Sequence, residues 1–216
     1  DVSRYYHPVT LPANARKAYV FYLPPDTSTY GSYPRIQLLA ENRTLASADV
    51  PVQQTIADDH LYVTVGDPTS ALSFLGALEP MGRGQAHVVD VALTDLPDDP
   101  LAWESIDVLI LQDVDTTALT DAQRQALQTW LQHGGSLVIG GGPGAASTVT
   151  GLGDLAPVRV TGSTSVQRLD GLQRTVDAPV ADGPFAVGVT TLRDDGVLVL
   201  SQPVDNENLV LVARRE

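Results

Sequence analysis

Three aspartates lie directly after apolar segments that have the composition of buried β-strands. Asp67 follows residues 61–65 (LYVTV), and Asp113 and Asp115 follow residues 107–111 (DVLIL). In an open α/β sheet, ligands bind outside the carboxyl ends of the strands. Carboxylates from different loops are ligands that Mg²⁺ and Ca²⁺ prefer. The three aspartates are therefore candidate ligands, with a helix cap at Asp67 and solvated turns at the other two as the alternative.

A glycine run follows the apolar residues 136–139 (SLVI) and gives a second candidate site. Gly140, Gly141 and Gly142 precede Pro143 and Gly144, and with Ala145 they fit a G-x-G-x-x-A dinucleotide pattern. The pattern normally follows the first strand of such a sheet, whereas here it follows the fourth. Proline also removes one backbone donor. We predict no dinucleotide cofactor, and the three glycines stay candidates for backbone contacts to a small molecule.

The residue types that carry most hydrolytic and metal chemistry are missing or scattered. The chain has no cysteine, which excludes disulfides, thiolate catalysis and zinc–thiolate sites. The four histidines show no H-x-x-x-H or H-E-x-x-H spacing. A serine hydrolase needs a serine at the centre of its strand-to-helix elbow, and Gly142 occupies that point. We predict no metal, no catalytic residue and no cofactor.

The charge of the chain limits its partners. It has 26 acidic against 13 basic residues, a formal net charge of −13, and Lys17 is its only lysine. Nucleic acid needs a basic surface to neutralise phosphates, so it is excluded as a partner, and anionic membrane surfaces are disfavoured for the same reason. A cation or a basic protein surface would be attracted.

Alternating strands and helices occupy the middle of the chain. Strands are predicted at residues 61–65, 87–93, 107–111 and 136–139, with helices from Asp67 to near residue 79 and from Thr120 to Gly134. The second helix begins with a capping box, TDAQ. Apolar strands that alternate with helices indicate a mostly parallel sheet in a three-layer α/β unit of the doubly wound class.

The two ends of the chain are β-rich. We predict strands at residues 17–23 and 35–39 within a β-rich, sandwich-like segment or small β domain at 1–58, and an α/β domain at 59–216. The latter would end in strands at 158–161, 185–190, 197–200 and 209–212, the last two forming a hairpin. Whether these strands complete the parallel sheet or build a separate β layer stays open.

Residues 103–144, and more loosely 61–144, resemble the class I glutamine amidotransferase-like superfamily. Working members have a G-x-C-x-G elbow after the fourth strand, and Gly142 stands at the position of the nucleophile. The resemblance implies a flavodoxin-like sheet in which glycine keeps the elbow's backbone without its side chain. The family's histidine has no counterpart, because residues 151–216 contain no histidine. We therefore expect the chain to have no glutaminase activity.

The amino-terminal β-rich segment together with residues 134–142 (GGSLVIGGG) resembles extracytoplasmic regions of bacterial membrane-anchored proteins. This resemblance implies a piece of a longer protein on the outer side of a membrane, with an unidentified protein partner there and membrane contact only through segments outside this chain. The first hypothesis is a non-catalytic interaction or sensing module. The alternatives are a domain that binds a small molecule or cation, and an enzyme that uses carboxylates alone.

Overall fold

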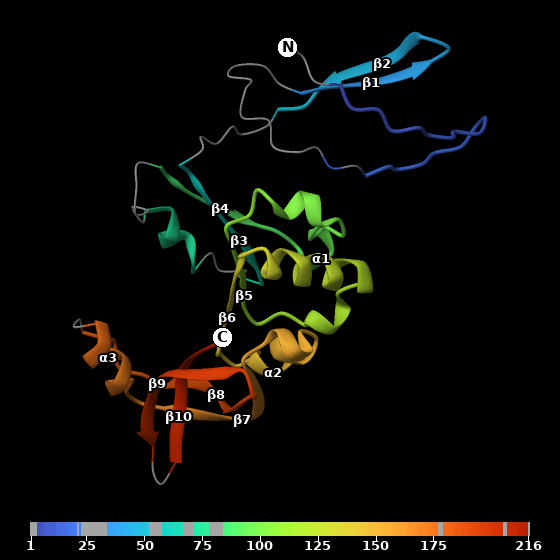
Figure 1. Cartoon of the computed structure of the whole chain (residues 1–216). Coiled ribbons are helices and arrows are strands. Elements are labelled where there is room, and N and C mark those ends of the chain that lie inside the picture. The colour runs from blue at the N-terminus through green and yellow to red at the C-terminus, as the bar shows by residue number, and fades with distance from the viewer. Residues whose placement is uncertain are drawn as a thin grey trace.

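The computed structural model describes residues 4–20, 22, 34–51, 58–66, 71–77, 84–176, 179–204 and 207–215. At its centre lies a parallel four-stranded sheet in the order β4-β3-β5-β6 (Figure 1). Its strands are β3 (His60–Val65), β4 (Ala86–Asp90), β5 (Val108–Leu111) and β6 (Ser136–Ile139). All four strands lie where the sequence predicts them. The α/β class with a parallel sheet is confirmed.

One face of this sheet carries the core. Val63 of β3 is in register with Leu109 of β5, and Leu109 with Leu137 of β6, so that their side chains share a face. This face packs against the 3₁₀ turns η2 (Leu93–Asp95) and η3 (Pro100–Trp103) and the helix α1 (Asp121–Gln132). The Trp103 and Trp130 rings meet there with centroids 5.2 Å apart. Apolar burial on this side holds the sheet and α1 together.

Among the described residues, the opposite face of the sheet is covered in part, since Thr64 and Ile110 are buried there. Between β3 and β4 the described residues form only a 3₁₀ turn, η1 (Ser73–Ala77), in which no residue is buried. The sequence predicts an α-helix from Asp67 here, but residues 67–70 and 78–83 lie outside the described part. Gly76 within the segment disfavours an α-helix. Val138 of β6 remains 49% exposed on this face.

Helix α1 forms as its sequence predicts, because both of its ends are capped. Thr120 and Gln123 make the reciprocal capping box, with Thr120 Oγ1 accepting from the Gln123 N–H at 3.2 Å. At the other end, Gly134 has a φ of +99° and Gly135 N–H donates to the Trp130 carbonyl at 3.0 Å. This 6→1 bond with a left-handed glycine is a Schellman motif.

Within the described residues, no helix is long and apolar enough to cross a membrane.

The carboxyl-terminal residues build separate antiparallel sheets and add no strand to the parallel one. Strand β7 (Val158–Val166) pairs with β8 (Phe185–Leu192), and β9 (Gly196–Val204) pairs with β10 (Glu207–Arg215) as the predicted hairpin. Helices α2 (Ala145–Thr150) and α3 (Asp170–Val176) and the turn η5 (Gly153–Leu155) were not predicted. The two helices are short, six and seven residues, so their periodicity is too brief to recognise.

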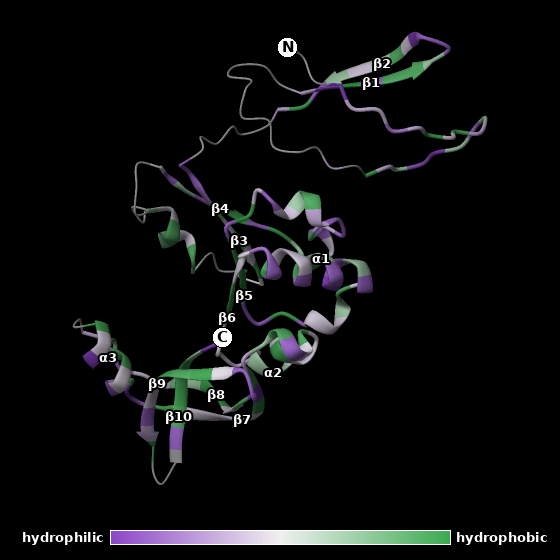
Figure 2. Ribbon diagram, viewed as in Figure 1, coloured by the Kyte–Doolittle hydropathy of each residue, from purple (hydrophilic) through white to green (hydrophobic). Residues whose placement is uncertain are grey.

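The amino-terminal part contains one hairpin, β1 (Arg35–Ala40) with β2 (Arg43–Asp49), and every residue of both strands is exposed. Glu41 and Asn42 both have positive φ, as a two-residue hairpin turn requires. Figure 2 shows green apolar residues along these strands. The predicted strand at 17–23 is absent from its described residues, 17–20 and 22, and no second sheet occurs among the described residues between 4 and 51. The sandwich-like arrangement of residues 1–58 stays a prediction, since it requires a second layer and the described residues contain one hairpin.

Candidate functional site

The loops that follow β3, β5 and β6 meet at the carboxyl edge of the sheet. Gln112 N–H donates to the Val65 carbonyl at 3.0 Å, and Gly140 N–H donates to the Leu111 carbonyl at 2.8 Å. Gly66 has a φ of +83°, and a Cβ there would lie 2.0 Å from the Gln112 carbonyl oxygen. Only glycine allows this approach of two strand ends. The edge is therefore closely packed between β3 and β5.

Asp113 joins the loop after β5 to the glycine turn after β6. Its Oδ1 accepts a hydrogen bond from the Gly144 N–H at 2.7 Å, and its own backbone has a φ of +50°. A Cβ at Gly142 would lie 3.4 Å from this carboxylate oxygen, and one at Gly144 would lie 2.7 Å from it. The structure thus brings two predicted site residues, Asp113 and Gly142, together, and the Asp113 side chain is exposed.

The glycine turn is also bonded to the carboxyl-terminal strands. The Gly141 carbonyl accepts from the Gly188 N–H of β8 at 2.9 Å. A Cβ on Gly188 would lie 3.3 Å from the Ala145 Cβ. Gly140 packs beside Gln112, where a Cβ would meet its side chain at 3.4 Å. Sequence reasoning missed Gly188, because nothing in the segment FAVGVT marks a contact with a turn more than forty residues earlier in the chain.

The backbone at Gly142 differs from the expectation drawn from the family resemblance. The described glycines with positive φ are Gly66, Gly134 and Gly153, and Gly142 is not among them. A left-handed backbone is strained in residues that have a side chain. Gly142, at the position of the nucleophile, does not have this backbone conformation. The expectation that glycine keeps a strained elbow backbone here is wrong.

Asp115 caps a turn and is not aimed at the glycine run. Its Oδ1 accepts from the Thr117 N–H at 3.0 Å and from the Thr117 hydroxyl at 2.6 Å, at the start of η4 (Thr116–Ala118). These two hydrogen bonds hold the pKa of Asp115 below its ordinary value. Asp67 lies outside the described residues. Across the described ranges, no group of three or more His, Cys, Asp or Glu residues could hold a metal ion.

Two buried threonines support the same edge and were not anticipated. Thr116 and Thr148 are fully buried, and the Thr116 hydroxyl donates to the Thr148 carbonyl at 2.8 Å. The Thr148 hydroxyl accepts from the Val114 N–H at 3.0 Å. Burying hydroxyls without partners would be costly, so these bonds fix α2 against the loop after β5. A threonine within a helix gives no such signal in the sequence.

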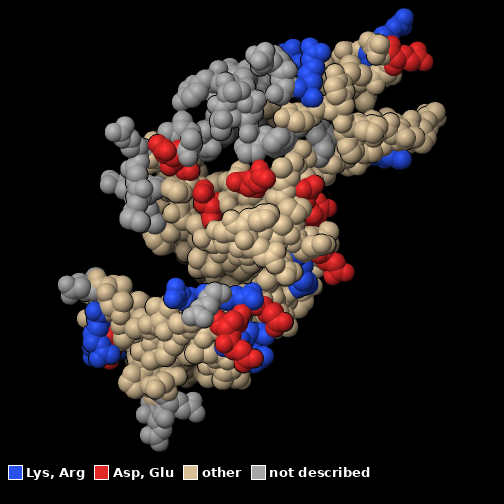
Figure 3. Space-filling model, in the orientation of Figure 1, with Lys and Arg blue, Asp and Glu red and all other residues tan. Residues whose placement is uncertain are grey.

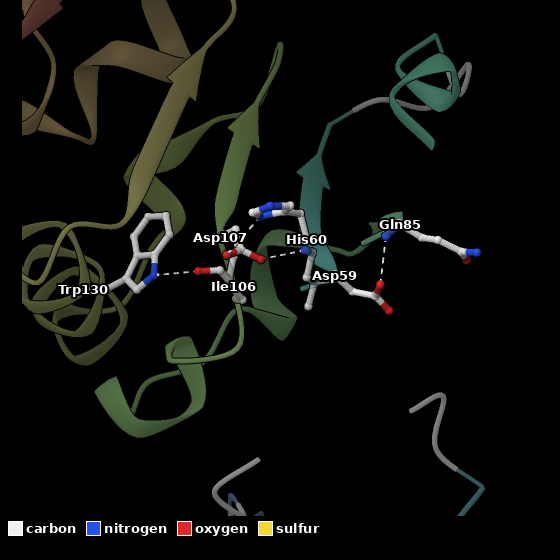
Figure 4. Close-up of polar contacts among 7 residues, drawn as sticks. Asp59, His60, Gln85, Ile106, Asp107 and Trp130 are labelled. Atoms are coloured by element: carbon white, nitrogen blue, oxygen red, sulfur yellow. Dashed lines mark hydrogen bonds and ion pairs between the residues drawn. The ribbon is translucent and has the colours of Figure 1, made fainter. Parts of the chain in front are cut away.

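The opposite, amino edge of the sheet carries two histidine–aspartate pairs, and Figure 4 shows the pair of His60 with Asp107. Asp59 accepts from the Gln85 N–H at 2.8 Å and lies 2.8 Å from His87 Nε2. Asp107 accepts from the Leu61 N–H at 2.7 Å and lies 3.5 Å from His60 Nδ1. Each carboxylate joins the start of one strand to its neighbour. Both aspartates therefore link neighbouring strands at this edge of the sheet. The spacing of the histidines and aspartates in the sequence did not predict this role.

Taken together, the candidate site is a turn whose backbone is bonded to other parts of the chain. The exposed Asp113 carboxylate accepts from the Gly144 N–H, and the Gly188 N–H donates to the Gly141 carbonyl. Comparisons of this chain with models of protein families, with curated proteins and with solved structures gave no match.

Proposed function

We propose that this chain is a non-catalytic interaction module, built on a degenerate amidotransferase-like sheet. The observation that carries the proposal is the occupied turn at the carboxyl edge. A reactive side chain at position 142 would face the Asp113 carboxylate 3.4 Å away, and the turn offers no nucleophile of its own. The strand order, with the first strand of the sheet between the second and the third, supports the flavodoxin-like assignment.

The apolar surface that a partner would use lies away from this turn. Tyr6, Val20 and Leu45 of the amino-terminal part are 74%, 75% and 63% exposed. Exposed apolar groups that gather in one part of a soluble protein mark interaction sites. An extracytoplasmic location and a partner at a bacterial envelope belong to the same proposal, and they rest on the sequence resemblance alone.

Site-directed photo-crosslinking in intact cells tests the interaction. A photoreactive amino acid replaces Leu45 in one variant and Val199, 56% exposed on β9, in a matched control. We expect one discrete crosslinked product from position 45 and none from position 199. Equal labelling from both positions, or no product from either, would contradict an interaction surface in the amino-terminal part.

The absence of catalysis has its own test. Gly142→Cys would install the missing nucleophile type at the family position. We expect no glutaminase turnover, because a thiolate beside the Asp113 carboxylate is disfavoured and no histidine exists in residues 151–216. Measurable glutamate release by the purified variant, above that of the unmodified protein, would show that the turn is a reactive site.

A further inference from the structure

The turn of the β1–β2 hairpin carries a sequence motif that none of the roles described above uses. Residues 42–44 read Asn-Arg-Thr, an asparagine followed two positions later by a threonine, with a residue other than proline between them. This spacing, N-x-S/T, is the acceptor motif for attachment of a sugar chain to the asparagine side chain. The chain has four asparagines, and none of Asn14, Asn206 and Asn208 has a serine or threonine two positions later. Asn42 is therefore the one candidate acceptor in the sequence.

The structure places this motif where an enzyme can reach it. Glu41 and Asn42 are the two central residues of the hairpin turn, with φ values of +49° and +62°. The flanking Ala40 pairs with Arg43 and closes the turn. Asn42, Arg43 and Thr44 are all exposed. The turn lies at the end of the hairpin opposite to its connection with the central sheet (Figure 1), so both the acceptor and the threonine of the motif are accessible.

The Asn42 amide has no structural contact that a modification would break. Within the described part of the chain, its side chain makes no hydrogen bond. Its two sequence neighbours, Glu41 and Arg43, are charged and exposed. Figure 3 shows acidic and basic groups at this end of the hairpin. Charged neighbours keep the turn in water, so the amide nitrogen is available to a reagent from solvent.

An asparagine in such a turn also has a purely conformational explanation. Two-residue hairpin turns favour asparagine because it tolerates a left-handed backbone. Asn14 illustrates this, since it has a φ of +61° and is equally exposed, but Arg16 stands two positions later. Thr44 is therefore the residue that distinguishes an acceptor motif from an ordinary turn. Asn14 provides a comparison with the same backbone conformation inside the same chain.

We propose that Asn42 carries an N-linked sugar chain. The donor is a sugar whose anomeric carbon is joined through a phosphate to a lipid or nucleotide carrier, and a glycosyltransferase of the same cell uses it. The Asn42 Nδ2 atom forms a bond to the anomeric carbon, and the bond from this carbon to the phosphate oxygen breaks. The phosphate leaves with that electron pair, and the amide nitrogen gives one proton to a base of the transferase. The inference rests on the extracytoplasmic location proposed above, because the motif is an acceptor in secreted proteins.

Mass spectrometry of the protein purified from its native cells tests the modification. We expect peptides that contain Asn42 to be heavier by a sugar chain, and peptides that contain Asn14 to be unmodified. Unmodified Asn42 would overturn the proposal. A sugar chain on Asn14 as well would also overturn it, because the motif would then not direct the modification.

Two matched variants at position 44 test the motif itself. Thr44→Ala removes the hydroxyl and leaves Asn42 in its turn, whereas Thr44→Ser keeps a hydroxyl at the same place. We expect the glycosylated fraction of Asn42 to fall about tenfold or more in Thr44→Ala and to persist in Thr44→Ser. Position 44 is exposed, and far-UV circular dichroism checks that both variants fold. Equal glycosylated fractions in the two variants would overturn the proposal.

Two further measurements separate the donor from the location. The chain is produced in the same cells with and without an export signal. A sugar chain on the exported form alone would identify the lipid-linked donor, one on both forms would identify the nucleotide-linked donor, and none on either form would overturn the proposal. Protease accessibility in intact cells measures the location of the native protein. An accessible protein without the sugar chain would overturn the glycosylation and leave the location standing, whereas a protected, glycosylated protein would overturn the location alone.

Discussion

At the scale of single residues, the carboxyl edge depends on Asp113 more than its sequence context indicates. The aspartate combines a left-handed backbone, a φ of +50°, with a hydrogen bond to the Gly144 N–H that begins α2. Asp and Asn tolerate this backbone better than other residues with a Cβ. That Asp113 is a candidate ligand stays a prediction from the sequence. Its role as a cap for the glycine turn required the folded chain.

Replacing Asp113 should show how much the hydrogen bond and the left-handed backbone preference contribute together. Asp113→Ala loses the acceptor and places alanine at a positive φ, so we expect a loss of about 2 kcal/mol in the free energy of unfolding. Asp113→Asn keeps an acceptor oxygen and the backbone preference, and should lose about 0.5 kcal/mol or less. Urea denaturation followed by circular dichroism measures both values. Equal losses would mean that neither an acceptor for the Gly144 N–H nor the left-handed backbone preference stabilises the fold.

The hydrogen bonds to Asp115 predict a dependence of stability on pH. Because Thr117 lowers the pKa of Asp115 in the folded chain, the contribution is present above the ordinary pKa and disappears as pH falls through the lower folded value. In Asp115→Asn, the unfolding temperature should therefore fall less between pH 5 and pH 2 than in the unmodified chain. Differential scanning calorimetry at several pH values tests this, and parallel curves for the two proteins would refute it.

At the scale of elements, α1 and the glycines that follow it form a unit that sequence reasoning predicted well. The capping box, the apolar face and the glycine stop all lie within about fifteen residues, so local rules decide them. Gly135 adds a contact that those rules do not include, since a Cβ there would lie 2.2 Å from the Trp130 ring. The helix end is thus fixed by the tryptophan that anchors α1 to the sheet.

Two glycine-to-alanine variants should distinguish this contact from a general glycine effect. Gly135→Ala should lose about 2 kcal/mol or more in unfolding free energy, because the Trp130 ring must move in a closely packed core. Gly141→Ala is the control, since a Cβ there has no atom within 4 Å and the backbone φ is not positive. We expect a change of about 0.5 kcal/mol or less in the control. Chemical denaturation measures the unfolding free energy of both variants. A larger loss in Gly141→Ala than in Gly135→Ala would show that the contact of residue 135 with Trp130 does not cause the loss.

At the scale of the whole molecule, charge is distributed unevenly along the chain. Thirteen acidic residues and two basic ones lie in residues 58–150, which contain the whole parallel sheet. Like charges in one compact unit repel each other and destabilise its folded state. The formal net charge of −13 is an average over the chain and does not show this concentration of acidic residues.

Added salt should therefore stabilise the chain. Between about 10 and 300 mM NaCl the screening length falls several-fold, which weakens the repulsion among the acidic residues. We expect the unfolding temperature to rise by a few degrees over this range. The variant Asp95→Asn/Glu104→Gln removes two of the acidic charges, so its unfolding temperature should rise less with added salt. Thermal unfolding followed by circular dichroism measures the effect, and a fall in the unfolding temperature with salt would show that attractive pairs dominate.

The sequence by itself determined the four parallel strands, the caps of α1, the β9–β10 hairpin and the lack of a cysteine nucleophile. These features follow from periodicity, capping residues and composition, all of which act within a few residues. Tertiary structure alone decided that Asp113 and Gly188 form hydrogen bonds to the glycine turn, that β7 to β10 form separate sheets, and that no described residue buries the β1–β2 hairpin. Each of these depends on contacts between residues far apart in the chain, which no local pattern encodes.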